Sequence, residues 1–151
     1  MRYLISFLFG VIGCCVMSAA GSVSVVKPGI ETLRDNGFEL LKGKRVGLIT
    51  NPTGVDNDLK STIDILHEAP GVNLVALFAP EHGVRGDIPA GQKVAVAKDA
   101  VTGVKVHSLY GATRRPTAEM LKDVDVLVYD IQDNGCRSYT FISTMGLAME
   151  Q

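Results

Sequence analysis

The sequence predicts an α/β fold whose sheet is mainly parallel and carries helices on both faces. Four short apolar runs are bounded by turn-forming residues, and segments with helical spacing alternate with them. Alternating strands and helices favour parallel pairing, because a helix is the usual crossover between parallel strands. A chain of 151 residues with 46% hydrophobic residues can bury the core of one such domain.

The first half of this domain is expected to contain two helices and two strands. The apolar spacing, although imperfect, predicts a helix from about Ile30 to near Gly43. Arg45–Thr50 is a short apolar run between turn residues, which is typical of a buried strand. A loop then leads to a helix within residues 59–69, whose apolar side chains fall on one side. Residues 72–79 predict the second buried strand.

The second half continues the alternation after a long loop. The expected elements are a loop at 80–100, a strand at 104–110, a short helix at 116–124 with Pro116 in its first turn, a strand at 125–131 and a helix within 138–151. The last helix reaches Gln151 without a capping residue and directly after an apolar face. We therefore expect the chain to be the front part of a longer protein, with an incomplete sheet.

The first twenty residues have the layout of a secretory signal peptide. Arg2 precedes an apolar run, and small residues follow it. Cleavage after Ala20 competes with a lipobox-like sequence that ends at Cys14, where the mature protein would carry a lipid anchor. Both readings predict a periplasmic or secreted protein, with a linker at 21–28 and one domain at 29–151.

Composition and charge exclude several classes of function. The 15 Lys and Arg residues balance 16 Asp and Glu residues, so there is no basic field to hold nucleic acid. The chain has no Trp, which argues against a base-stacking or flat aromatic carbohydrate platform. With Cys14 and Cys15 in the targeting segment, Cys136 has no disulfide partner. We expect Cys136 to be a partly buried structural residue rather than a nucleophile.

The loop FAPEHGVRGD places titratable groups among glycines after a predicted strand. In open α/β sheets, ligands bind at the carboxyl ends of the strands, because the loops converge there. Glu81, held between an apolar strand and a glycine-rich loop, could serve as a general acid. It could instead cap a helix or pair with Arg85.

Two acids follow the last predicted strand. Asp130 and Asp133 could assist a reaction, orient a sugar hydroxyl or bind a cation. Alternatively, Asp133 could cap the following turn while Asp130 pairs with Arg137.

Familiar cofactor and nucleophile motifs are missing from the sequence. It lacks HExxH, CxxC, DxDxDG, GxGxxG, GxxxxGK[ST] and GxSxG. We therefore predict no nucleotide cofactor and no metal, although Glu81, His82, Asp87 and Asp130 could still meet in space as metal ligands. The acids, arginines, tyrosines and asparagine that remain suit a sugar.

Two longer motifs carry a family resemblance. PEHGVRG at 80–86 and DIQDNGCRSYT at 130–140 closely resemble the N-terminal half of the bacterial exo-β-N-acetylmuramidase family, over about residues 29–151. The resemblance implies a Rossmann-like domain followed by a smaller C-terminal domain. It also implies a glycosidase of cell-wall recycling that removes N-acetylmuramic acid from the non-reducing ends of peptidoglycan fragments.

The resemblance further implies roles for individual residues. Glu81 is expected to be the catalytic acid or base, with Asp130 or Asp133 as a possible second carboxyl. The residues expected to form or support the sugar site are Asn51, His82, Arg85, Gln132, Arg137 and Tyr139. One of the arginines could pair with the lactyl carboxylate of muramic acid.

The sequence is compatible with several mechanisms and with two alternative functions. The mechanism could be retaining, inverting or assisted by the N-acetyl group of the substrate. A non-catalytic muropeptide-binding protein and a metal-dependent hydrolase are alternative functions.

Overall fold

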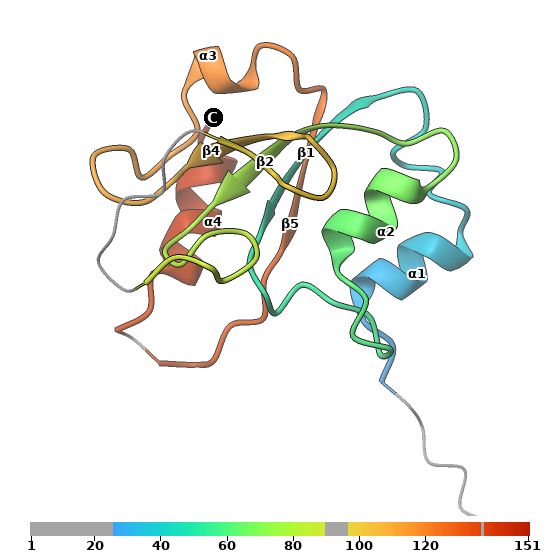
Figure 1. Cartoon of the computed structure of the whole chain (residues 1–151), viewed down its shortest axis with the longest axis horizontal. Coiled ribbons are helices and arrows are strands. Elements are labelled where there is room, and N and C mark those ends of the chain that lie inside the picture. The colour runs from blue at the N-terminus through green and yellow to red at the C-terminus, as the bar shows by residue number, and fades with distance from the viewer. Residues whose placement is uncertain (1–25, 90–96, 137) are drawn as a thin grey trace, which may run out of the picture.

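The computed structural model describes residues 26–89, 97–136 and 138–151. Its centre is one five-stranded sheet in the order β3-β4-β2-β1-β5 (Figure 1). The strands are β1 (Arg45–Thr50), β2 (Asn73–Ala79), β3 (Ala97–Lys98), β4 (Lys105–Ser108) and β5 (Val126–Asp130). Only β3 runs antiparallel to its neighbour, so the predicted mainly parallel sheet is confirmed. The signal-peptide prediction for residues 1–20 lies outside the described residues.

The four parallel strands follow a Rossmann-like order. Counted along the chain by themselves, these strands lie in the order third, second, first, fourth, which begins the Rossmann order. The strand order reverses between β1 and β5, which pair in register from Val46 to Thr50. Such a reversal is the place where loops diverge and ligands can enter.

β1 lies inside the sheet, between β2 and β5, and its sequence is apolar on both faces. Val46, Leu48 and Ile49 are fully buried. A Cβ atom at Gly47 would lie 3.0 Å from the side chains of Leu127 and Phe78, so the glycine lets the neighbouring strands pack closely. At its start, the guanidinium group of Arg45 binds Asp125, which fixes β1 against β5 and lowers the pKa of Asp125 to about 2.

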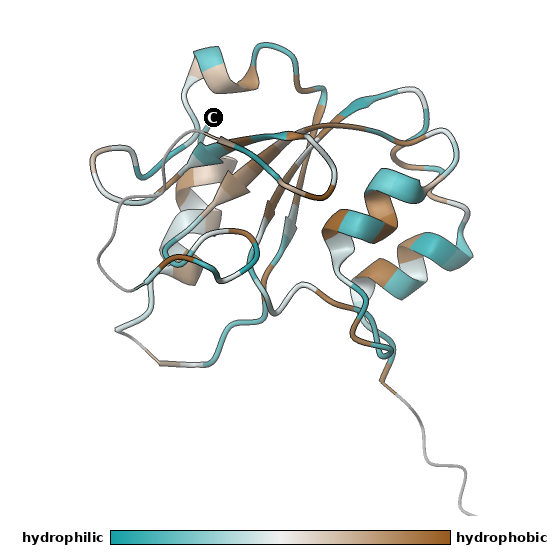
Figure 2. Ribbon diagram, in the orientation of Figure 1, coloured by the Kyte–Doolittle hydropathy of each residue, from teal (hydrophilic) through white to brown (hydrophobic). Residues whose placement is uncertain are grey.

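Helices cover both faces of the sheet, as predicted. α1 (Gly29–Asp35) and α2 (Thr62–Glu68) pack on one face, against a core that includes Leu48 and Leu77. α3 (Ala118–Leu121) and α4 (Phe141–Met149) lie on the other, around Ile49. Figure 2 shows hydrophobic strands between helices that mix hydrophobic and hydrophilic residues. No described helix is long and apolar enough to cross a membrane.

The first helix is shorter than its sequence pattern predicts. α1 ends at Asp35, because Gly37 and Phe38 adopt left-handed φ angles of 61° and 57° that break the helix. Phe38 and Leu41 still reach the core, 7% and 3% exposed, but they do so from turns. This explains why their spacing fits a helix imperfectly.

The start of α3 and the presence of β3 also differ from the sequence predictions. Pro116 lies before α3 rather than in its first turn, because the Thr117 side chain takes the capping position and accepts a hydrogen bond from the Met120 amide at 3.3 Å. β3 lies inside the predicted 80–100 loop. Its two residues are too short for any periodicity to be visible in the sequence.

Candidate active site

The loops after β2 and β4 begin side by side. The strands pair Ala79 with Ser108, and the amide of Leu109 donates a hydrogen bond to the carbonyl of Ala79 at 2.8 Å. Glu81 and Tyr110 each come two residues after this pair. Parallel pairing therefore brings together two side chains that are far apart in the sequence.

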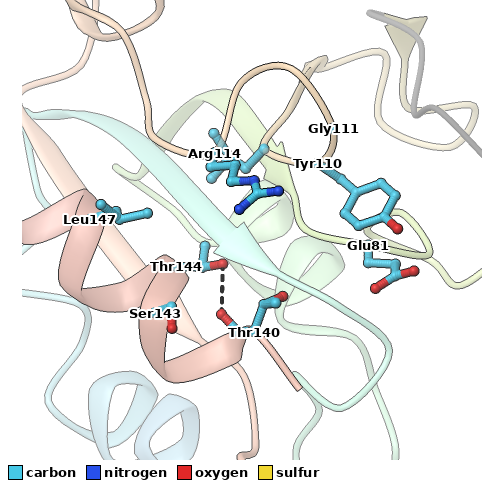
Figure 3. A pocket seen from close by; sticks show the side chains of 9 residues that line it. Glu81, Tyr110, Gly111, Arg114, Thr140, Ser143, Thr144 and Leu147 are labelled. Carbon is cyan, nitrogen blue, oxygen red and sulfur yellow. Dashed lines mark hydrogen bonds between the residues drawn. The ribbon is translucent and has the colours of Figure 1, made fainter. Parts of the chain in front are cut away.

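A cavity of about 560 Å³ opens beside these two loops (Figure 3). Glu81, Tyr110 and Arg114 reach it from the loops, and Thr140, Ser143 and Thr144 reach it from α4 and its cap. Leu109 and Leu147 add apolar surface. A cavity of this size, with apolar walls and a few placed polar groups, is typical of a small-molecule site.

Glu81 and Tyr110 lie next to each other in this cavity, which we call the Glu81 cavity. The neighbouring Glu81 carboxylate raises the pKa of Tyr110 above its usual value, with a smaller contribution from burial. Figure 3 shows the two groups adjacent at one side of the cavity. The phenol is protonated at neutral pH, so it can donate a hydrogen bond to the carboxylate.

The loop that presents Glu81 is closed on itself. His82 has a left-handed φ of 73°, and its carbonyl accepts a hydrogen bond from the Ile88 amide at 3.3 Å. The His82 ring nitrogen Nδ1 also contacts the Ile88 carbonyl oxygen at 3.2 Å. A left-handed non-glycine residue persists only where its surroundings fix it. The predicted sugar-binding residue His82 thus faces its own loop, and it does not line the Glu81 cavity.

Arg85 anchors the same loop to the body of the domain. Its guanidinium nitrogens bind Asp99 at 2.6 and 2.9 Å and Asp64 at 2.8 and 3.3 Å. Hydrogen bonds from Arg85, and then from Thr102, lower the pKa of Asp99, despite burial that acts in the opposite direction. The carboxylate partners of Arg85 are therefore Asp64 and Asp99, and Glu81 is not among them. Arg85, which the sequence predicted to bind substrate, lies outside the Glu81 cavity.

Asp130, at the end of β5, is hydrogen-bonded to β1 and α2, whereas the side chain of Asn51 binds within its own turn. The Asn51 side chain accepts hydrogen bonds from the Thr53 amide and hydroxyl at 2.9 and 2.6 Å. The Asp130 carboxylate accepts one from the Thr62 hydroxyl, and the Asp130 carbonyl accepts one from Thr50 at 2.8 Å. The predicted site residue Asp130 thus holds β5 to its neighbours at the reversal point of the sheet, and the predicted site residue Asn51 fixes the turn after β1.

A second cavity, of about 480 Å³, lies next to the start of α4. Asp133, Cys136 and Tyr139 line it, and Ser143 lines both cavities. The Asp133 carboxylate accepts a hydrogen bond from the Gly135 amide at 2.6 Å, so it caps its own turn while it borders the cavity. The predicted residues Asp133 and Tyr139 are thereby placed near the Glu81 cavity.

Gln132, Arg137 and Cys136 complete the predicted motif. The backbone amide of Gln132 donates a hydrogen bond to the Thr53 hydroxyl at 2.8 Å, which connects the motif to the loop after β1. Arg137 lies outside the described residues. The expectation that Cys136 is partly buried is wrong, because the turn after Asp133 leaves this residue exposed. Hydrogen bonds with Ser138 lower the pKa of the Cys136 thiol.

Sequence reasoning missed most of the wall of the Glu81 cavity. Arg114 follows no motif, and the polar residues of α4 resemble those of any helix start. Tyr110 follows a predicted strand, but its position beside Glu81 depends on the order of the strands in the sheet. Within the described ranges, no group of three or more His, Cys, Asp or Glu side chains is placed to hold a metal ion.

Comparison with known proteins identifies the family. The model of the N-terminal part of exo-beta-N-acetylmuramidase NamZ matches residues 46–151. The chain belongs to the NamZ family. It is 59% identical over 125 residues to the peptidoglycan beta-N-acetylmuramidase NamZ of Bacillus subtilis strain 168, which covers 83% of this chain and 30% of that protein. The resemblance drawn from the two motifs is thereby confirmed.

Solved structures agree with this assignment. A DUF1343 family protein from Bacteroides fragilis NCTC 9343 has 70% identity and a TM-score of 0.75, over 82% of this chain and 30% of that chain. Another from the same strain has 38% identity and a TM-score of 0.64, over 81% and 30%. The chain thus spans about a third of the length of these NamZ relatives.

Proposed function

We propose that the chain is the catalytic N-terminal part of an exported exo-β-N-acetylmuramidase. Its reaction is the release of N-acetylmuramic acid from the non-reducing ends of peptidoglycan fragments during cell-wall recycling. The observation that carries this proposal is the position of Glu81 in a cavity beside Tyr110, in a chain of the NamZ family. The substrate would be a muropeptide or a disaccharide derived from peptidoglycan.

The cavity supports binding of one terminal sugar. Its volume of about 560 Å³ falls in the usual range for small-ligand sites. Hydroxyl groups of Tyr110, Thr140 and Ser143 can bind sugar hydroxyls, while Leu109 and Leu147 can contact the apolar face of the ring. An exo-acting enzyme needs a site of this limited size, because it removes a single residue at a time.

In the proposed mechanism, Glu81 protonates the glycosidic oxygen as the bond to the anomeric carbon breaks. Glycosidases pair such an acid with a second group that attacks the anomeric carbon or activates water. Asp133 is the candidate on this chain, because it borders the adjoining cavity. The acetamido group of the substrate is the alternative second group. The anomeric configuration of the released sugar, measured by NMR, distinguishes an inverting from a retaining mechanism.

Two disaccharides of opposite sequence test the proposal. We expect release of N-acetylmuramic acid from a disaccharide in which this sugar is the non-reducing residue, and none when N-acetylglucosamine occupies that position. Cleavage of both disaccharides, or of the second alone, would contradict the proposal. Binding of the first without release would instead identify a muropeptide-binding protein.

Export is proposed from the sequence of residues 1–20 alone. The mature chain is expected to begin either after cleavage at Ala20 or at a lipidated Cys14. Mass spectrometry of the mature N-terminus distinguishes them. Recovery of the uncleaved chain from the cytoplasm would contradict export.

A further inference from the structure

N-acetylmuramic acid and N-acetylglucosamine, two sugars of the cell wall, differ in one charged group. N-acetylmuramic acid carries a lactyl ether on O3, which N-acetylglucosamine lacks. The lactyl carboxylate is ionised at neutral pH, so a site that selects muramic acid should offer a cation. An arginine is suited to this role, because its planar fork can donate two parallel hydrogen bonds to a carboxylate.

Most described arginines are already engaged by carboxylates of the protein. Arg34 pairs with Asp56 at 2.9 Å, and Arg115 approaches Glu150 at 3.5 Å. Arg45 and Arg85 bind the acids named above. By contrast, no ion pair joins Arg114 to an acid within residues 26–89, 97–136 and 138–151.

Arg114 is also the one cationic side chain among the described residues that line the Glu81 cavity. In Figure 3 its guanidinium group lies between Tyr110 and the side chains of α4. Glu81, Tyr110 and Arg114 all line the cavity, and the charge of Arg114 acts on the pKa of Tyr110 in opposition to the larger effect of Glu81. The cavity therefore has a carboxyl group and a cation at separate positions.

We infer that Arg114 binds the lactyl carboxylate of N-acetylmuramic acid and sets the preference of this cavity for muramic acid over glucosamine. This inference rests on the proposed function. The glycosidic oxygen is on C1 of the pyranose ring and the lactyl group is on O3. One ring can thus present the first to Glu81 and the second to Arg114. Arg85 is excluded from this role by its two bound aspartates.

Three ligands separate recognition of charge from recognition of the sugar. They are N-acetylmuramic acid, its lactyl amide and N-acetylglucosamine, each titrated into the whole chain by calorimetry or NMR. We expect N-acetylmuramic acid to bind about tenfold more tightly than the other two ligands. This factor is at the lower end for a hydrogen bond between charged groups, because Arg114 is exposed. Arg114→Gln should abolish this preference and leave binding of N-acetylglucosamine unchanged.

Two further variants control the result. Arg114→Lys keeps the charge without the fork and should retain only part of the preference. Arg115→Gln changes the adjacent arginine, which does not line the cavity, and should behave as the wild type. Thermal unfolding of each variant checks that the fold is intact.

The outcomes distinguish failure of this inference from failure of the proposed function. If the wild type binds all three ligands equally, or if Arg114→Gln keeps the preference, the inference is wrong while the cavity remains a sugar site. If Arg114→Gln weakens all three ligands equally, the residue has a structural role and the inference is also wrong. If the wild type binds none of them, the proposed function fails and the inference fails with it.

Discussion

The Tyr110 hydroxyl and the Glu81 carboxylate lie side by side in a cavity at the carboxyl ends of β2 and β4 (Figure 3). Ala79 pairs with Ser108, and Glu81 and Tyr110 lie two residues after these two positions, respectively. The pairing register of two parallel strands therefore sets this contact, and the strained loop at His82 maintains it. Substitutions of either residue should report on chemistry rather than on folding.

Tyr110→Phe tests this relationship. Loss of the hydroxyl frees the Glu81 carboxylate to adopt other orientations. We expect kcat to fall about tenfold, the effect of losing one hydrogen bond to a charged group, with a smaller change in KM. Steady-state kinetics on a β-N-acetylmuraminide measures both values. An unchanged kcat would show that Tyr110 does not position Glu81.

Asp99→Asn tests the anchoring of the Glu81 loop. The Asp99 side chain is 3% exposed and its partner Arg85 is 26% exposed. Breaking a buried ion pair costs about 3–5 kcal/mol, and the partial exposure of Arg85 reduces our expectation to about 2–3 kcal/mol. Urea unfolding measures the loss. As a matched control, Lys122→Gln removes a surface pair with Glu119 and should change stability by less than about 0.5 kcal/mol.

The same ion pair predicts a dependence of stability on acid pH. The pKa of Asp99 is lower in the folded chain than its ordinary value of 3.8. Its contribution to stability is therefore complete above that value and is lost as the pH falls below it. Unfolding free energies at pH 7, 4 and 3 should show a smaller acid loss in Asp99→Asn than in the wild type. Equal losses would remove Asp99 as the cause.

Gly54→Ala tests the close packing at the β1–β5 reversal. A Cβ atom at Gly54 would lie 2.2 Å from Thr50 Oγ1 and 2.8 Å from the carbonyl oxygen of Asp130. We expect destabilisation of about 1–3 kcal/mol or more, as for an overpacked core. Gly29→Ala is the control, because nothing lies within 4 Å of its Cβ position. Equal melting temperatures for the two variants would contradict this packing.

The sequence predicts the parallel strands and the site edge well, because apolar runs and turn residues are local signals. It also places Glu81 at that edge. The partners of Arg85 were not predictable, since Asp64 and Asp99 are distant in sequence and come together only through the fold. The early end of α1 was hidden because Phe38 and Leu41 remain in the core after the helix has broken.

Hydrolysis of a chromogenic β-N-acetylmuraminide by the wild-type chain and by Glu81→Gln tests the central claim most directly. We expect turnover by the wild type and a loss of about 100-fold or more in the variant, the usual contribution of a general acid. Binding of N-acetylmuramic acid should stay nearly unchanged. A variant that keeps the wild-type rate, or a wild type that binds the sugar without releasing product, would contradict the assignment of Glu81 as the catalytic acid of this chain.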